Sequence, residues 1–313
     1  MNKSGRRAVV FAYHNVGVRG LAVLLAQGVD VRLVITHEDN PSETIWFRSV
    51  AELAALHGIA VIKPNEPNQA DVIEQVRACQ PDFLFSFYYR HMLGGDLLAL
   101  PSRGAYNLHG SLLPKYRGRV PVNWAVLHGE TETGASLHRM VLKPDAGALV
   151  DQCAVPILPN DTAQDVFEKV TCAAEVVLAR SVPRLIAGTA TETPLDLKAG
   201  SYFGGRKPDD GRIDWRAPAW NIHNLIRAVA PPYPGAFADI DGKRLRVLGS
   251  FYRAKERAQP SSPRLYWEGE RCWLDCADGQ RLLLTQLAIG DALLNRAQFL
   301  AAFGREELAF FGA

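Results

Sequence analysis

Short apolar runs alternate with longer stretches of mixed polarity along the first part of the chain. The apolar runs are typical of buried strands and lie at residues 8–13, 31–36, 60–62 and 83–87. The stretches between them predict helices at residues 18–27, 47–57 and 69–79. Strands that alternate with helices of roughly 10–15 residues predict an α/β fold with a doubly wound, mostly parallel sheet. Such sheets bind ligands beyond the carboxyl ends of their strands.

The pattern changes toward the end of the chain. A long helix is predicted at residues 162–186, and the stretch 189–204 is rich in Thr, Gly and small residues, as in a linker. After a further helix at residues 217–229, short alternating stretches between residues 236 and 287 predict a small OB-like β-barrel. We therefore expect an α/β domain over residues 1–200 and a β-barrel domain over residues 201–313.

Composition narrows the class of protein. Apolar residues make up 48% and the net charge is +2, which is too low for a chain that mainly coats nucleic acid. No apolar run approaches the roughly 20 residues of a membrane span, and the run after the basic N-terminus is too short for a signal peptide. The five cysteines have no zinc-site spacing. We expect reduced cysteines, no metal and a cytoplasmic location.

The strongest site candidate combines Asn107, His109 and Asp145. Residues i and i+2 of a strand share a face, so Asn107 and His109 would project side by side at a strand end. Asp145 lies in a Pro-Asp-x-Gly turn that could approach from a neighbouring strand. An amide that stabilises an oxyanion, an imidazole that moves protons and a carboxylate that holds the imidazole suffice for acyl transfer to an amine. The alternative is a histidine satisfied by a backbone carbonyl, with Asn107 and Asp145 as turn residues.

These residues also carry a resemblance to a known family. Residues 107–114 (NLHGSLLP), followed by residues 145–147 (DAG), resemble the signature of the folate-dependent formyltransferases. Within that family the chain is most similar, over roughly residues 8–240, to the domain that formylates UDP-4-amino-4-deoxy-L-arabinose. That reaction belongs to lipid A modification in lipopolysaccharide biosynthesis and underlies polymyxin resistance. The closer likeness rests on residues 11–14, 36–41, 85–91, 115–119, 137–140, 227–230 and 234–237.

The resemblance implies a role for each matching residue. His109 would be the acid–base group, Asn107 would stabilise the transition state, and Asp145 would favour the charged form of the histidine. The resemblance further implies binding of the formyl donor, 10-formyltetrahydrofolate, by His91, Met92, Leu93, Arg119, Val141, Leu142, Lys143 and Pro144. Residues expected at the amino-sugar substrate are Tyr88, Ser111, Lys115, Arg117 and Arg206. The basic loop at residues 115–119 could equally be a solvated surface, and residues 204–210 a charged turn.

One loop bears on the choice of acceptor. Residues 38–47 (EDNPSETIWF) contain three acidic residues and no Lys or Arg, so they would repel a tRNA phosphate backbone. We therefore expect a nucleotide-linked amino sugar, first UDP-4-amino-4-deoxy-L-arabinose and then other UDP- or dTDP-amino sugars, and no nucleic-acid partner. The alternatives are a methionyl-tRNA formyltransferase, a formyl-folate hydrolase and a non-catalytic binding module. The similar formyltransferase domain belongs to a bifunctional protein that continues into a dehydrogenase domain, whereas this chain ends at Ala313, so we expect either that this activity lies on a separate protein or that the pathway differs. A homo-oligomer is compatible with the sequence.

Overall fold

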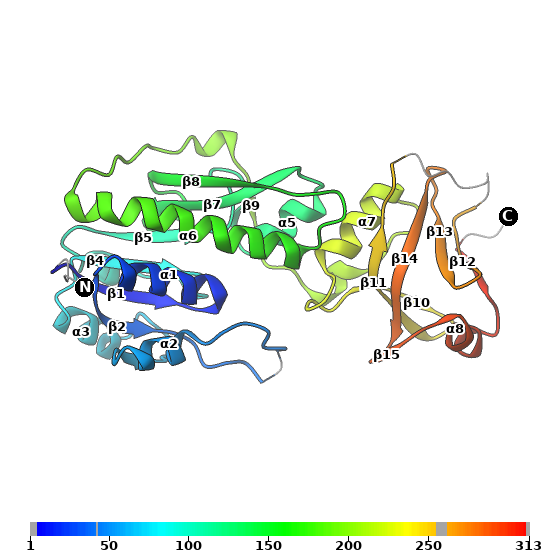
Figure 1. The fold of residues 1–313 in the computed structure, drawn as a ribbon, viewed down its shortest axis with the longest axis horizontal. Coiled ribbons are helices and arrows are strands. Elements are labelled where there is room, and N and C mark those ends of the chain that lie inside the picture. The colour runs from blue at the N-terminus through cyan, green and yellow to red at the C-terminus, as the bar shows by residue number, and fades with distance from the viewer. Residues whose placement is uncertain (1–4, 42, 255–261, 311–313) are drawn as a thin grey trace. The chain divides into compact units, whose positions relative to one another are not determined.

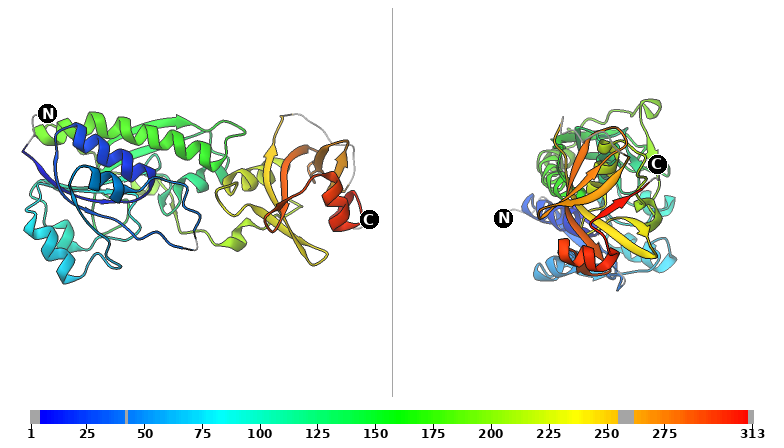
Figure 2. Two further views of the ribbon diagram at one scale, coloured as in Figure 1. Left: turned by 60° about the horizontal axis from the view of Figure 1, so that its bottom comes forward. Right: turned by 90° about the vertical axis from the view of Figure 1, so that its right-hand side faces the viewer.

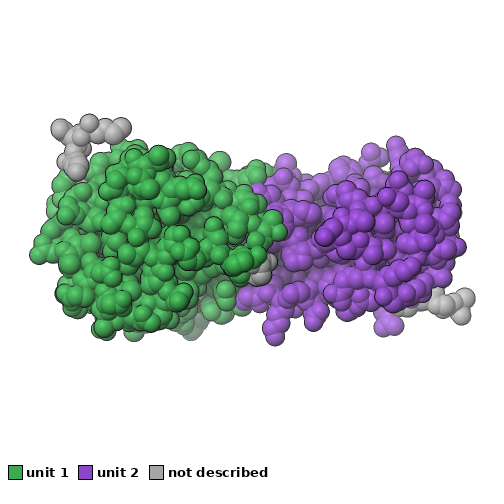
Figure 3. Space-filling model, turned by 90° about the horizontal axis from the view of Figure 1, so that it is seen from below, with its two compact units in different colours: residues 1–121, 133–155, 168–204 green, residues 122–132, 156–167, 205–313 purple. Residues whose placement is uncertain are grey.

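The computed structural model describes residues 5–41, 43–254 and 262–310. These residues divide into two compact units, shown in different colours in Figure 3. Unit 1 comprises residues 1–121, 133–155 and 168–204, and unit 2 comprises residues 122–132, 156–167 and 205–313. The units are groups of residues in mutual contact, and the functional division at residue 200 remains a prediction.

A seven-stranded sheet forms the centre of unit 1 and confirms the predicted α/β fold (Figure 1). Its strand order is β3-β2-β1-β4-β5-β7-β8, in which the first five strands pair in parallel and β7 is antiparallel to β5. The strands are β1 (Arg7–Ala12), β2 (Asp30–Ile35), β3 (Ala60–Ile62), β4 (Phe83–Phe87), β5 (Gly104–His109), β7 (Glu132–Arg139) and β8 (Leu149–Pro156). Every residue of β4 is buried, which fits a central parallel strand covered on both faces.

Helices follow the strands in the alternation that the sequence predicts. They are α1 (His14–Ala26), α2 (Val50–Leu56), α3 (Ala70–Ala78), α4 (Gly95–Leu98), α5 (Pro121–Leu127) and α6 (Ala163–Ala187). An ion pair between Arg19 of α1 and Glu175 of α6, at 2.5 Å, joins these two helices. Helix α1 packs closely on the sheet, because a Cβ on Gly20 would lie 2.5 Å from the ring of Phe87. The helix therefore needs glycine at this position despite its low helix propensity.

Some elements differ from the prediction. Helix α1 begins four residues before the expected position 18, at His14, where polar side chains interrupt the apolar pattern. The stretch expected to be a linker contains a short 3₁₀ turn (Leu197–Ala199) and the strand β9 (Tyr202–Phe203). Strand β9 pairs in parallel with β6 (Arg117–Gly118). Such two-residue pairings depend on the tertiary fold and have no local sequence pattern.

Unit 2 contains an antiparallel sheet that curls into a half-barrel (Figure 1, Figure 2). This agrees with the predicted class of the C-terminal part. Its strand order is β10-β11-β14-β13-β12-β16, and β15 pairs with β14. The strands are β10 (Ala236–Ile240), β11 (Lys243–Phe251), β12 (Arg264–Glu268), β13 (Arg271–Asp275), β14 (Arg281–Ile289), β15 (Ala292–Leu293) and β16 (Glu307–Ala309). Unit 2 also contains the helices α7 (Ala219–Ala228) and α8 (Arg296–Phe303), a 3₁₀ turn (Pro208–Gly211), most of α5 and the first turn of α6.

Candidate active site

Four polar side chains meet near the carboxyl end of β5. Asn107 and His109 belong to β5, and His138 stands opposite Asn107 on β7. Asp145 reaches the same point from the loop after β7. Its Oδ1 atom lies 3.5 Å from His109 Nδ1, 3.5 Å from His138 Nε2 and 3.4 Å from Asn107 Nδ2. The structure thus brings together the three residues singled out in the sequence and adds His138.

The backbone around Asp145 explains how the carboxylate is held in place. Asp145 has a positive φ of 48°, and the Gly118 amide donates a hydrogen bond to its Oδ2 at 2.8 Å. Two residues later a Cβ on Gly147 would lie 1.9 Å from the carbonyl oxygen of Arg139. The loop therefore folds back tightly onto the end of β7, and only glycine allows that approach.

The environment of Asp145 keeps its carboxyl ionised. Burial alone would raise the pKa of this group, since only 13% of the side chain is exposed. The neighbouring imidazoles of His109 and His138, together with the hydrogen bond from the Gly118 amide, outweigh burial and hold the pKa of Asp145 well below its usual range. A fixed negative charge therefore faces the imidazole of His109 at neutral pH.

Both ring nitrogens of His109 face acceptors. Nδ1 faces the Asp145 carboxylate, and Nε2 lies 2.8 Å from the carbonyl oxygen of Tyr116. A neutral imidazole has one N–H, whereas the charged ring has two. Two flanking acceptors therefore hold the imidazole in one orientation. The structure combines the two arrangements weighed from the sequence, the carboxylate contact and the backbone carbonyl contact.

His138 fixes the orientation of Asn107. Its Nδ1 lies 2.9 Å from the carbonyl oxygen of Arg139, so the proton of the neutral ring belongs on Nδ1. Its Nε2 then accepts a hydrogen bond from Asn107 Nδ2 at 3.1 Å. The sequence analysis gave His138 no role. Ser136 and His138 are two residues apart on β7 and share one face of the strand, but the register of β7 against β5 cannot be predicted from a local pattern.

The residues expected at the substrate have different surroundings. Ser111 is fully buried and its hydroxyl donates to the carbonyl of Lys115 at 2.7 Å, within the loop itself. Arg117 is 8% exposed, whereas the side chain of Lys115 lies on the surface. Tyr88 packs its hydroxyl over Gly110, where a Cβ would lie 2.0 Å from the oxygen. In unit 2, Arg206 covers the ring of Trp124 at 5.0 Å and donates to the carbonyl of Asp210 at 2.8 Å.

Large apolar side chains are exposed where the formyl donor is expected. Met92 is 53% exposed, Val141 40% and Leu142 69%, and the two segments adjoin because a Cβ on Gly95 would lie 3.9 Å from Leu142. Arg119, Lys143 and His91 also lie on the surface, and Pro144 is half-buried. Leu93 differs, because it is 2% exposed and belongs to the core of unit 1, so only its backbone could face a ligand.

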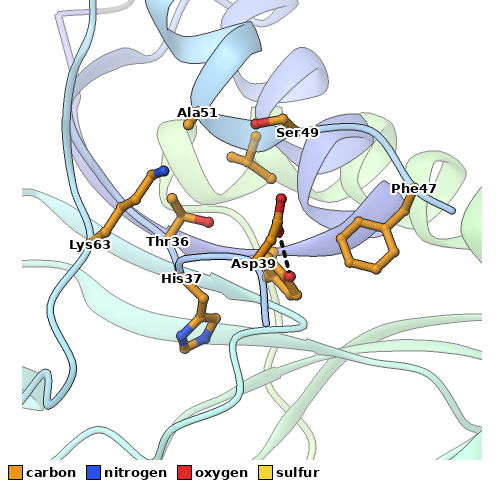
Figure 4. Close-up of a pocket in the computed structure, with 9 residues that line it drawn as sticks. Thr36, His37, Asp39, Phe47, Ser49, Ala51 and Lys63 are labelled. Carbon is orange, nitrogen blue, oxygen red and sulfur yellow. Dashed lines mark hydrogen bonds between the residues drawn. The ribbon is translucent and has the colours of Figure 1, made fainter. Parts of the chain in front are cut away.

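A small hollow lies beyond the carboxyl ends of β1 and β2 (Figure 4). Tyr13 donates to Asp39 at 2.7 Å across it, and Thr36, Phe47 and Lys63 line it as well. Its volume of about 30 Å³ suits one or two water molecules and excludes a nucleotide. Burial lowers the pKa of His37, at its edge, to about 4, so this ring is neutral near pH 7.

Two classes of feature are missing from the described part of the chain. No group of three or more His, Cys, Asp or Glu side chains in residues 5–41, 43–254 and 262–310 could hold a metal ion. None of the helices in the same ranges is both long enough and apolar enough to cross a bilayer.

Comparison with known families gives two matches. Residues 21–182 match the family model described as formyl transferase. Residues 206–304 match the model of the formyl transferase C-terminal domain. The first model covers slightly more than half of the chain, and it contains all four residues that meet at Asp145.

Solved structures share the fold. An N-formyltransferase from Helicobacter canadensis, in complex with folinic acid and dTDP-3-aminofucose, has a TM-score of 0.70 at 21% identity, covering 89% of this chain and 98% of that one. The sugar 3-N-formyltransferase WlaRD, with dTDP and 5-N-formyl-THF, has a TM-score of 0.72 at 19% identity, covering 92% and 98%. HypX from Aquifex aeolicus, in complex with tetrahydrofolic acid, has a TM-score of 0.65 at 15% identity, covering 95% of this chain and 47% of that one.

Proposed function

The chain belongs to the formyl transferase family, and from this premise we propose that it moves a formyl group from 10-formyltetrahydrofolate to the amine of a nucleotide-linked amino sugar. The observation that carries the proposal is the position of Asp145. Its Oδ1 lies within 3.5 Å of His109 Nδ1 and 3.4 Å of Asn107 Nδ2. Acid–base and oxyanion-stabilising groups therefore meet at one carboxylate.

The proposed roles follow from the contacts. In the transfer, the bond from the formyl carbon to the folate nitrogen breaks and a bond to the sugar amine forms. One proton must pass from the amine to the folate nitrogen, and His109 is the group that can carry it. The carboxylate of Asp145 keeps His109 oriented and stabilises its charge.

Asn107 is proposed to stabilise negative charge on the formyl oxygen. Of its two contacts, the one to His138 is 3.1 Å long and the one to Asp145 is 3.4 Å long. The longer hydrogen bond is the weaker one. The Asn107 N–H that points at Asp145 can therefore donate to the oxyanion in its place, while the other N–H stays hydrogen-bonded to His138.

The surface next to Asp145 fits a folate. Met92, Val141 and Leu142 present apolar side chains to solvent on adjoining segments, and a flat pterin ring would cover them. The exposed basic groups of Arg119 and Lys143 suit the carboxylates at the other end of the molecule. This surface supports the donor-binding assignment made from the resemblance, with Leu93 contributing only its backbone.

The acceptor is proposed to be an amino sugar carried by a nucleotide, with UDP-4-amino-4-deoxy-L-arabinose as the first candidate. The acidic loop supports a small acceptor over tRNA. Each described carboxylate of that loop contacts a neighbouring residue: Glu38 pairs with Lys63 at 2.9 Å, Asp39 accepts from Tyr13 at 2.7 Å and Glu43 pairs with Arg90 at 2.7 Å. The loop has no Lys or Arg of its own that could hold a phosphate backbone.

The test measures release of tetrahydrofolate from 10-formyltetrahydrofolate with different acceptors. The acceptors are UDP-4-amino-4-deoxy-L-arabinose, a dTDP-amino sugar, methionyl-tRNA and none. Release that depends on a sugar nucleotide supports the proposal and identifies the base and sugar. Release with tRNA overturns the choice of acceptor, release without any acceptor indicates a hydrolase, and no release by the wild type favours a binding module.

A further inference from the structure

Side chains of two neighbouring strands fix the loop that follows His109. This loop, residues 110–116, leaves the end of β5 and leads to β6. Its one internal backbone hydrogen bond among those resolved runs from Lys115 N to Leu112 O, at 3.1 Å. The carbonyls of Ser111 and Leu113 instead accept from side chains outside the loop. The first half of the loop is therefore held by β7 and β8. Its far end is held by Ser201, whose hydroxyl accepts from the Tyr116 amide at 2.8 Å and whose amide donates to the Pro114 carbonyl at 3.3 Å.

Ser136 on β7 is the first anchor. It stands opposite His109 in the sheet and is completely buried. Its hydroxyl donates to the carbonyl of Ser111 at 2.6 Å and accepts from the Leu113 amide at 3.1 Å. One hydroxyl thus holds two residues of the loop.

Gln152 on β8 is the second anchor. Its Nε2 donates both hydrogens, one to the carbonyl of Leu113 and one to the hydroxyl of Ser136, each at 2.8 Å. Because Ser136 donates its own proton to Ser111, its hydroxyl oxygen can accept two hydrogen bonds, one from the Leu113 amide and one from Gln152. Gln152 therefore holds the loop directly and also orients the other anchor.

The fixed loop leads to the contacts of the candidate site. Tyr116 places its carbonyl 2.8 Å from His109 Nε2, and Gly118 places its amide 2.8 Å from Asp145. Both backbone groups lie within five residues of Leu113. The position of the Tyr116 carbonyl, which faces His109 Nε2, is thus coupled to Gln152. The two hydrogen bonds that Gln152 Nε2 donates do not include one to His109 itself.

We propose that Gln152 is a positioning residue for formyl transfer, acting through loop 110–116 on the Tyr116 carbonyl that orients His109. The inference rests on the proposed function. It makes Gln152 a determinant of turnover and leaves substrate binding to other residues.

The experiment compares Gln152→Met, which keeps the length of the side chain and removes its polar group, with the wild type. A matched control is Gln75→Met on α3, because the side chain of Gln75 is exposed. Hydrogen exchange of a peptide spanning residues 110–118 is measured first. We expect exchange of this peptide to become at least about 10-fold faster in Gln152→Met and to stay unchanged in Gln75→Met.

Steady-state kinetics then separate positioning from binding. We expect kcat to fall about 10- to 100-fold, with the KM of both substrates within about threefold of wild type.

A second variant keeps the proposal testable if Gln152→Met does not fold. Ser136→Ala removes the other anchor and should show the same exchange pattern and the same loss of kcat. Faster exchange with unchanged kcat overturns the positioning role, and unchanged exchange overturns the coupling itself. A wild type without turnover on any acceptor refutes the proposed function and with it the catalytic role, whereas the exchange result still decides the coupling.

Discussion

Alanine at position 110 should disable the site, because its methyl group would occupy the space of the Tyr88 hydroxyl. A Cβ on Gly110 lies 2.0 Å from that oxygen and 3.0 Å from Cζ of the same ring. Cβ contacts below 3.0 Å are essentially not observed, so the ring or the strand end must move by about 1 Å. Overpacking of this kind costs about 1–3 kcal/mol. Since His109 directly precedes Gly110, a displacement of about 1 Å can also lower kcat about 100-fold.

The Tyr88→Phe variant tests this explanation. It removes the oxygen and leaves the contact of 3.0 Å to Cζ, which needs a shift of only a few tenths of an ångström. Thermal unfolding and kcat are measured for the wild type, both single variants and the double variant. We expect Gly110→Ala to be much milder in the Tyr88→Phe background, with a coupling free energy of about 1–2 kcal/mol. Equal losses in both backgrounds would refute the role of the hydroxyl, and a fully active Gly110→Ala variant would refute the close approach.

Three further changes test other parts of the account. His109→Ala should lower kcat at least about 100-fold while binding of 10-formyltetrahydrofolate, followed by calorimetry, stays within a few-fold; loss of binding would show a structural role. Burial lowers the pKa of His223 from 6.5 to about 4. The unfolded chain therefore binds this proton more tightly than the folded protein does. About 3 kcal/mol of folding stability that is present above pH 6.5 should be lost as the pH falls toward 4. His223→Gln should flatten this dependence in denaturant titrations, and an unchanged slope would contradict it. Arg227→Met should cost about 3 kcal/mol in urea unfolding, because the buried guanidinium donates to the Asp161 carbonyl at 3.0 Å, whereas the exposed Arg48→Met control should cost little.

The strands of unit 1 could be predicted from the sequence because burial on both faces leaves an apolar run. Strands β3 and β4 have the predicted limits, and Asn107 and His109 share the predicted face. Strand β8 was missed because its residues are mostly half-buried or exposed, and no alternation identifies it. One of these polar residues, Gln152, directs its side-chain amide at loop 110–116 and not at an apolar core.

The sequence also did not reveal that His138 and Ser136 belong to the candidate site. His138 and Ser136 gain their significance from the register of β7 against β5, which sets them opposite Asn107 and His109. Register between strands about 30 residues apart is a property of the fold and is not encoded in a local pattern. The spacing and the resemblance both pointed to Asn107, His109 and Asp145, whereas the hydrogen bonds that hold these side chains became readable only in three dimensions.

The central claim is most directly tested by following the formyl carbon itself. The wild-type protein is incubated with 10-formyltetrahydrofolate labelled with ¹³C in the formyl group and with UDP-4-amino-4-deoxy-L-arabinose or a dTDP-amino sugar, and the products are examined by NMR. The labelled carbon should appear as a formamide on the sugar nitrogen, and His109→Ala should abolish this signal. Labelled carbon found only as free formate, or remaining on the folate with every amino sugar, would contradict the central claim.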